Sequence, residues 1–237
     1  MNTKFIRSEE VAEGTMAFHF EKPTEFHYKA GQSIDLTLVN PPETDAEGNT
    51  RAFSLSSAPS EEGFMISTRM RDTAFKRVLK TLAPGAALTF EGPFGSMTLH
   101  NDLTKPAVFL AGGIGVTPFR SMAVQAANDK APHTIFLFYS NRRPEDAAFL
   151  KELMALESAN ANFKFIGTMT NMKDSKQPWT GETGYIDGAM LKKYLGDLNA
   201  PIYYLAGPAT MVAAMRKMLN DNGVNDDYIR AEEFSGY

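Results

Sequence analysis

The spacing of apolar residues changes character near residue 104, and this change divides the chain into two parts. Before residue 104, apolar and polar residues alternate in short segments that are separated by turn residues such as Pro41-Pro42 and Ala83-Pro84-Gly85. A period of two with such turns is typical of strands in an antiparallel barrel or sandwich. We expect strands at residues 16–20, 34–39, 51–55, 64–69 and 86–91, and one helix over residues 74–82.

After residue 104, apolar runs alternate with amphipathic stretches. Strands are expected at residues 107–111, 134–140, 163–169 and 202–206, and helices at residues 118–128, 144–158, 189–195 and 209–222. Buried strands that alternate with helices predict a parallel doubly wound sheet, which binds ligands at the carboxyl ends of its strands. The predicted fold class is therefore two domains, an antiparallel β-barrel followed by an α/β doubly wound domain, divided between residues 104 and 105.

Composition excludes several kinds of site. The 237 residues include no cysteine, which excludes a disulfide, a thiolate nucleophile and a cysteine-ligated iron–sulfur cluster on this chain. Four scattered histidines lack ligand spacing, so no metal site is expected, and His19 is interpreted as a surface residue. A net charge of −4 argues against general nucleic-acid binding. No apolar run approaches the roughly 20 residues of a membrane span, and the N-terminus lacks a secretory pattern, so we expect a cytoplasmic protein.

A glycine-rich segment, Gly112 to Pro118, lies between an apolar run and a predicted helix. Glycine lets backbone N–H groups approach an anion, and a helix N-terminus adds unpaired donors and partial positive charge. We place Thr117 at the N-cap and Pro118 at the first helical position. Because Pro118 stands where the G-x-G-x-x-G fingerprint has its third glycine, either a phosphate-binding loop or a plain strand-to-helix turn fits the segment.

A second segment, Arg51-Ala-Phe-Ser54, carries side chains suited to a phosphorylated ring compound. Period two places Arg51 and Phe53 on one face of a strand and Ser54 on the other. An arginine can fork onto a phosphate, an aromatic ring can stack on a planar ring, and a hydroxyl can bond to a ring nitrogen. An ordinary strand with surface serines explains the same residues equally well.

Six segments in order resemble the ferredoxin–NADP reductase superfamily over essentially the whole chain. They are Arg51–Ser54, which resembles the R-x-Y/F-S motif, and residues 91–96, 110–119, 138–142, 206–211 and 232–237. The resemblance implies an FAD-binding barrel over residues 1–104, and an NAD(P)-binding domain over residues 105–237 with its tail near the flavin. It implies an NAD(P)H-dependent flavoprotein reductase, in which a hydride passes between nicotinamide and flavin and electrons pass to a separate acceptor.

The resemblance also implies the residues of the site. Arg51 binds the FAD pyrophosphate, Phe53 packs against the isoalloxazine, and Ser54 reaches its N5 edge. The other residues expected at the flavin are Thr68, Arg69, Thr73, Ala74, Lys76 and Phe234. Those expected at the nicotinamide coenzyme are Gly112, Gly113, Gly115, Thr117, Pro118, Ser140, Asn141, Arg142, Arg143, Ala206, Gly207, Pro208 and Met211. The predicted catalytic residues are Ser54, Thr117 and Glu233.

Several positions depart from the family pattern or allow two interpretations. Lys76 stands where the family often has a serine, and Ala206 replaces a family cysteine. Hydride transfer should survive without that cysteine, because the hydride passes directly from one ring to the other. Met211 also suits a core position. Tyr237 either covers the flavin ring or anchors the tail.

The coenzyme and its surroundings also leave alternatives open. Arg142 and Arg143 fit a 2′-phosphate, which favours NADPH over NADH, although a solvated loop explains them too. Residues 181–186 resemble a family segment and are interpreted as a turn with hydrophobic anchors.

The sequence allows several interpretations of the electron acceptor. A basic run, Arg69, Arg71, Lys76, Arg77 and Lys80, is interpreted either as a solvated helix face with phosphate contacts or as a docking patch for an acidic carrier such as ferredoxin or flavodoxin. A reductase component of an oxygenase, or a ferric or free-flavin reductase, is the alternative within enzymes. A non-catalytic flavin-binding regulatory subunit is the alternative from another class, although such subunits often carry a cysteine cluster.

Overall fold

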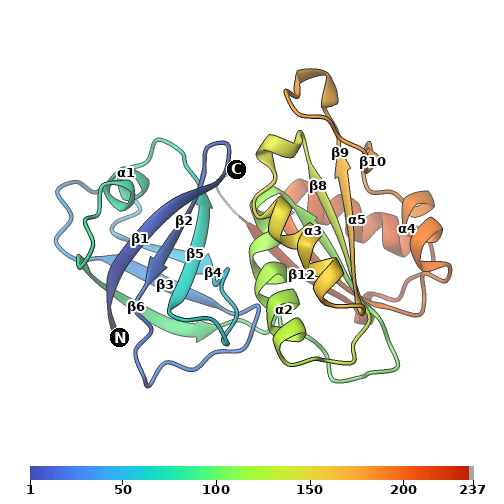
Figure 1. The fold of residues 1–237 in the computed structure, drawn as a ribbon, viewed down its shortest axis with the longest axis horizontal. Coiled ribbons are helices and arrows are strands. Elements are labelled where there is room, and N and C mark those ends of the chain that lie inside the picture. Colours follow the sequence, from blue (N-terminus) through green and yellow to red (C-terminus); the bar gives the residue numbers. More distant parts are fainter. Residues whose placement is uncertain (235–237) are drawn as a thin grey trace.

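The computed structural model describes residues 1–234, which form two domains side by side (Figure 1). The first contains β1 (Asn2–Ala12), β2 (Thr15–Phe20), β3 (Ser33–Leu38), β4 (Thr50–Ser54), β5 (Phe64–Arg69), α1 (Ala74–Lys80) and β6 (Ala87–Phe94). The second contains β7 (Ala107–Gly112), α2 (Val116–Asn128), β8 (Ile135–Asn141), α3 (Leu150–Ala159), β9 (Phe163–Met169), β10 (Glu182–Thr183), α4 (Gly188–Leu195), β11 (Ile202–Pro208), α5 (Ala209–Asp221) and β12 (Ile229–Phe234). The predicted fold class is confirmed.

The first domain is an antiparallel sheet with the strand order β4-β3-β6-β1-β2-β5. A bridge between Leu55 and Ile66 joins its two edges, because Leu55 directly follows β4 and Ile66 belongs to β5. The interior is aromatic, with ring centroids of Phe26 and Phe90 4.8 Å apart and those of Phe20 and Phe64 5.2 Å apart. Large rings on alternating positions therefore fill the closed sheet.

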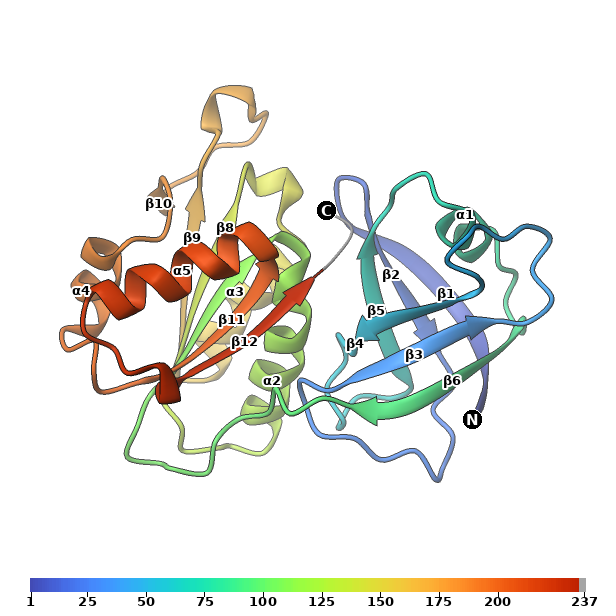
Figure 2. The same ribbon diagram turned by 180° about the vertical axis from the view of Figure 1, so that it is seen from behind.

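The second domain is a parallel sheet with the order β10-β9-β8-β7-β11-β12. Alternate residues of β7 enter different cores: Phe109 packs with α2 and α3, whereas Val108 and Leu110 pack with α4 and α5. Helices α2 and α3 lie in front of the sheet in Figure 1, and α5 lies in front of it in Figure 2. Burial on both faces explains the continuous apolar runs.

Four elements differ from the sequence predictions. The two-residue strand β10 lies in the segment 181–186, which was interpreted as a turn. Strands β1 and β12 were not predicted, because edge and surface positions in them are charged and obscure the alternation. The helix predicted over residues 144–158 is wrong in its first part. Its residues 144–146 form a separate 3₁₀ turn, and Phe149 has a φ of +60°, so α3 begins only at Leu150.

The two domains meet along hydrogen bonds as well as apolar contacts. The Glu13 amide, in the turn between β1 and β2, donates to the Glu145 carbonyl oxygen at 2.8 Å. The connecting segment between β6 and β7 is also fixed, because the Tyr204 hydroxyl accepts from the His100 amide at 2.8 Å. Within residues 1–234, no helix has the length and apolar character needed to cross a bilayer.

Candidate functional site

A cavity of about 500 Å³ lies at the carboxyl ends of the parallel strands. Ligands of doubly wound sheets bind at this edge, and the volume is typical of small-molecule sites. Thr15 and Arg69 of the barrel line it on one side. On the other side it is lined by several residues of the predicted coenzyme set: Gly112, Gly113, Ser140, Asn141, Arg142, Pro208 and Met211. Gly115, Thr117, Pro118, Arg143, Ala206 and Gly207 of that set do not line it.

Two glycine-containing turns pack backbone against backbone beside this cavity. A Cβ on Gly115 would lie 2.3 Å from the carbonyl oxygen of Ala206, at the end of β11. Gly207 has a φ of +152°, and a Cβ there would lie 3.1 Å from the carbonyl oxygen of Gly112. Both the close approach and the positive φ favour glycine. The packing of the β7 turn on β11 therefore accounts for these glycines, and it keeps side chains out of this part of the site.

The prediction that Thr117 caps α2 is wrong. The helix begins at Val116, so Thr117 and Pro118 are its second and third residues. A 3₁₀ turn over Gly113–Gly115 leads directly into the helix and moves its start toward the N-terminus. The Thr117 hydroxyl instead donates to the Ile114 carbonyl oxygen at 3.0 Å, and Thr117 is only 1% exposed.

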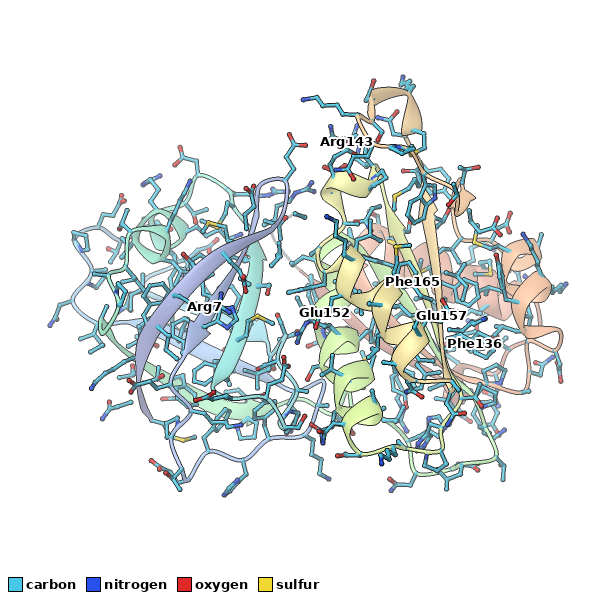
Figure 3. All side chains as sticks on the ribbon, in the orientation of Figure 1. Arg7, Phe136, Arg143, Glu152, Glu157 and Phe165 are labelled. Atoms are coloured by element: carbon cyan, nitrogen blue, oxygen red, sulfur yellow. The ribbon has the colours of Figure 1, made fainter. Side chains whose placement is uncertain are left out.

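The two adjacent arginines after β8 point to different surroundings. Arg142 lines the cavity. Arg143 bonds to Asp146 at 2.7 Å and to Glu13 of the barrel at 3.0 Å, and it is labelled in Figure 3. Hydrogen bonding to Asp146 raises the pKa of Arg143, and the same contact lowers the pKa of Asp146. The amide Nδ2 of Asn141, a buried donor in the wall of the cavity, has no hydrogen-bond partner within the described part of the chain.

Arg51 lies at one end of the barrel, held by the loop between β3 and β4. Its Nη2 bonds to Asp45 at 2.6 Å, and its guanidinium lies 5.3 Å from the centroid of the Phe75 ring. The bond to Arg51 is the main reason that the pKa of Asp45 is lowered. Phe53 also packs near Phe75, with a centroid distance of 5.8 Å, and Ser54 is buried beside β3.

The remaining predicted flavin residues of the barrel gather around the start of α1. Thr73 is the N-cap of α1, which begins at Ala74, and its hydroxyl accepts from the Lys76 amide at 3.4 Å. The Lys76 ammonium donates to the Arg69 carbonyl oxygen at 2.8 Å, one residue after Thr68. Burial lowers the pKa of Lys76, and the positive charges of Arg71 and Arg51 lower it further. This crowding of cations favours a bound anion.

Strand β12 places the side chains of Glu232 and Glu233 on opposite faces of the sheet. Glu232 lies beside Ala206 of β11, and its Oε2 is buried without a hydrogen-bond partner among residues 1–234. Burial raises the pKa of Glu232. Phe234, on the same face, packs against the core cluster that includes residues of both domains. Glu233, the predicted catalytic carboxylate, is exposed on the other face, and Tyr237 lies outside the described residues.

The sequence did not reveal several residues that line the cavity. Thr15 comes from a barrel strand far away in the sequence. Tyr185, which is 82% exposed, lies in the segment that we interpreted as a turn with hydrophobic anchors. An aromatic residue within that family-like segment was the one available signal. A large exposed ring at the mouth of a cavity can stack on a planar ligand.

The basic run is partly neutralised. Arg77 forms ion pairs with Glu43 and Asp72, and these pairs raise its pKa. Arg69 points toward the second domain, with its Nη2 3.9 Å from Asp146. These contacts reduce the positive charge that the basic run could present to an acidic partner.

Comparisons with known proteins agree with this geometry. Residues 109–217 match the family described as an oxidoreductase NAD-binding domain. The reductase subunit of glycine betaine monooxygenase from Chromohalobacter salexigens is 29% identical over 223 residues, which cover 93% of this chain and 60% of the relative. One component of the Na(+)-translocating NADH-quinone reductase of Methylococcus capsulatus is 31% identical over 202 residues, which cover 78% and 49%. The chain thus spans half to three-fifths of these relatives' length.

Solved structures support the same architecture. The FAD/NAD-binding domain of a nitric oxide dioxygenase from Vibrio cholerae has a TM-score of 0.83 at 18% identity, with 98% of both chains covered. A ferredoxin NADP+ reductase from Neisseria gonorrhoeae, bound to FAD and NADP, has a TM-score of 0.80 at 20% identity, again with 98% of both chains covered. The fold and the NAD-binding domain define a two-domain reductase-type architecture. The chain shares the two-domain fold of these FAD- and NAD(P)-binding structures, and its residues 109–217 match the oxidoreductase NAD-binding family.

Proposed function

We propose that this chain is an FAD-dependent oxidoreductase that takes a hydride from NAD(P)H and passes electrons to a separate acceptor. The cavity at the carboxyl edge of the parallel sheet is the observation that carries this proposal, because residues of both domains line it. A nicotinamide coenzyme in that cavity would lie against the barrel, where Arg69 forms part of the wall. We divide the chain at residues 104 and 105 into a flavin domain and a coenzyme domain.

The barrel residues fit a flavin dinucleotide. Arg51 and Lys76 supply positive charge for its pyrophosphate, and the lowered pKa of Lys76, caused first by burial and then by cationic neighbours, is the sign of a site that an anion would stabilise. Phe53 would pack against the ring system, and Ser54 would bond to its edge. Bound FAD supplies a ring that accepts two electrons and releases them singly.

The residues of the second domain would orient the coenzyme. The buried Asn141 amide, which has no hydrogen-bond partner in residues 1–234, would donate to a ribose or phosphate oxygen. Thr117 stabilises the turn through its bond to the Ile114 carbonyl oxygen. We propose Glu232, in place of Glu233, as the carboxylate beside the reacting rings, because the Oε2 atom of Glu232 is buried and its side chain shares a face with Phe234. Burial raises its pKa.

We propose NADPH as the coenzyme, bound through Arg142 alone. Arg142 lines the cavity, whereas Arg143 is bonded to Asp146 and Glu13. Asp146 also lines the cavity, and a carboxylate there would favour the free 2′-hydroxyl of NADH. Its bond to Arg143 reduces that preference.

The acceptor is a separate protein or small molecule. The similarity to the reductase subunit of a glycine betaine monooxygenase makes an oxygenase component the second candidate beside a ferredoxin- or flavodoxin-type carrier. The ion pairs of Arg77 reduce the charge available to steer an acidic carrier. A ferric or free-flavin reductase would transfer electrons equally fast when no protein acceptor is present.

A spectrum tests the function directly. The purified protein should bind FAD, show flavin absorption bands, and be bleached anaerobically by NADPH faster than by NADH. Arg142→Ala should weaken NADPH binding about 10- to 100-fold and leave NADH binding within about twofold, because a charge-assisted contact to phosphate is lost. Arg143→Ala serves as the matched control and should not discriminate between the coenzymes. A protein that does not take up FAD would refute the proposal.

A further inference from the structure

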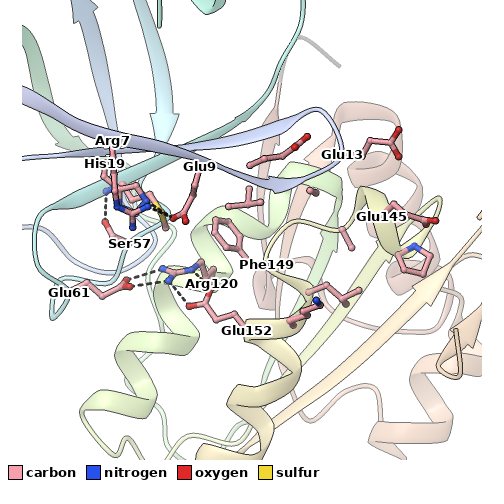
Figure 4. A pocket seen from close by; sticks show the side chains of 18 of the residues that line it. Arg7, Glu9, Glu13, His19, Ser57, Glu61, Arg120, Glu145, Phe149 and Glu152 are labelled. Atoms are coloured by element: carbon pink, nitrogen blue, oxygen red, sulfur yellow. Dashed lines mark hydrogen bonds and ion pairs between the residues drawn. The ribbon is translucent and has the colours of Figure 1, made fainter. Parts of the chain in front are cut away.

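A second cavity, of about 800 Å³, lies between the barrel and the side of the second domain that carries α2 and α3 (Figure 4). None of the predicted site residues lines it. Its most buried charged residue is Arg120 of α2, which is only 5% exposed. A buried arginine is costly unless its donors are all paired, so its contacts indicate what it does.

Arg120 bonds to carboxylates of both domains. Glu61 of the barrel accepts from Nη1 at 2.9 Å and from Nη2 at 3.0 Å. Glu152 of α3 accepts from Nε at 2.9 Å and from Nη2 at 2.5 Å. Although burial opposes a charged guanidinium, these two carboxylates raise the pKa of Arg120. The guanidinium also lies 5.0 Å from the centroid of the Phe149 ring, so the side chain has one orientation.

The remaining Arg120 contact reaches the barrel backbone. Its Nη1 donates to the Ser56 carbonyl oxygen at 2.7 Å, and the neighbouring Ser121 hydroxyl donates to the Ser57 carbonyl oxygen at 2.6 Å. The barrel holds the same segment through β5, since the amide of Met65 donates to the Ser57 hydroxyl at 2.8 Å. Backbone that two elements hold in this way has little freedom to shift.

The hydrogen bonds of Arg120 connect the flavin side and the coenzyme side of the proposed site. Ser56 follows Ser54, the proposed flavin contact, by two residues. Arg120 follows Thr117 by three residues on α2, which is less than one helical turn. Ser54 and Thr117, in different domains, are therefore connected by a short stretch of chain on each side and by the hydrogen bond from Arg120 to the Ser56 carbonyl oxygen.

We propose that Arg120 is a positioning residue that fixes the separation between Ser54 and Thr117, and hence between the flavin and the nicotinamide. This inference rests on the proposed function. The planar guanidinium makes five hydrogen bonds to Glu61, Glu152 and Ser56, which the three N–H groups of an ammonium could not all replace. A lysine would keep the charge and lose this geometry. The reaction rate depends steeply on the separation of the reacting rings, because a displacement of about 1 Å can cost a factor of about 100.

The test compares Arg120→Lys and Arg120→Met in the flavin-loaded protein with Arg7→Met as a control. Arg7 lines the same cavity but is more than half exposed, and its ion pair is with Glu9 of its own domain. We expect both Arg120 variants to slow flavin reduction by saturating NADPH about 10- to 100-fold and to weaken the charge-transfer absorption of flavin and nicotinamide. FAD affinity and reduction by dithionite should stay within about twofold of wild type. Arg7→Met should change none of these.

A folded Arg120→Lys protein with the wild-type reduction rate and charge-transfer band would overturn the inference. A purely structural role would lower the melting temperature and leave both readouts unchanged at low temperature, which also refutes it. Amide hydrogen exchange provides a readout without activity: the Lys variant should exchange faster at residues 56 and 57. If the wild-type protein binds FAD but neither coenzyme reduces the flavin, the proposed function fails. The amide hydrogen exchange at residues 56 and 57 then still tests whether Arg120 holds this backbone in place.

Discussion

Substituting Gly115 tests whether the two glycine-containing turns are packed backbone against backbone. Gly115 has φ −60° and ψ −8°, so alanine suits its dihedral angles and adds no backbone strain. The new Cβ would lie 2.3 Å from the Ala206 carbonyl oxygen and 2.6 Å from the Gly207 nitrogen. Both are backbone atoms, so the turn must move by about 1 Å to restore ordinary van der Waals contact. Overpacking of this kind costs about 1–3 kcal/mol of unfolding free energy.

The same displacement should impair the coenzyme site more than the flavin site. Gly115→Ala should slow reduction of the bound flavin by NADPH about 100-fold, while FAD affinity stays within about twofold. Gly112→Ala is the graded control, because its Cβ would meet the sulfur of Met211, at the end of a flexible side chain. Stopped-flow reduction and urea unfolding measure both effects. A Gly115→Ala protein with wild-type stability and reduction rate would refute the backbone packing.

Other contacts give three further predictions. Asp45→Asn should strengthen FAD binding, measured by fluorescence quenching, because Arg51 loses its ion pair with Asp45 and keeps the one with the exposed Glu47; unchanged or weaker binding would contradict the role of Arg51. Tyr204→Phe should lower the free energy of urea unfolding by about 1–3 kcal/mol, because the buried His100 amide and ring nitrogen lose their partner. Burial lowers the pKa of His100 below its usual 6.5, so the unfolded chain takes up a proton that the folded protein resists. Unfolding free energy should therefore fall as the pH drops from 7 to 5, and His100→Gln should remove part of that slope.

The two hydrophobic periods predicted most of the fold. Strands β5 and β9 have the predicted bounds, because each is an uninterrupted apolar or alternating run in a central or well-covered position. The edge strand β12 has two adjacent glutamates, so its residues show no clear alternation. Phe149 interrupts a helical pattern with a left-handed φ, which its packing with the domain junction explains and its sequence neighbours do not.

The sequence predicted those parts of the site that lie at the carboxyl ends of the parallel strands. Gly112, Ser140 and Pro208 lie at the carboxyl ends of parallel strands, so their proximity follows from the fold class. The direction of individual side chains did not follow. Neighbouring residues of extended backbone point to opposite sides, so Glu232 and Glu233 of β12 diverge. Arg142 and Arg143 lie in the bend after β8, where Arg142 lines the cavity and Arg143 bonds to Asp146. Pairs of like residues in the sequence therefore overstate how many of them reach one ligand.

The charges at the cavity rim support an anionic ligand even after their mutual pairing. Asp146 lies 2.7 Å from Arg143 of its own domain and 3.9 Å from Arg69 of the barrel. Glu13 lies 3.0 Å from the same Arg143 guanidinium, so the two carboxylates are balanced by Arg143 and Arg69. Arg142 then remains as positive charge that lines the cavity. Because Arg69 and Glu13 belong to the barrel, any shift between the domains would change this balance, and coenzyme affinity is coupled to the junction that Arg120 holds.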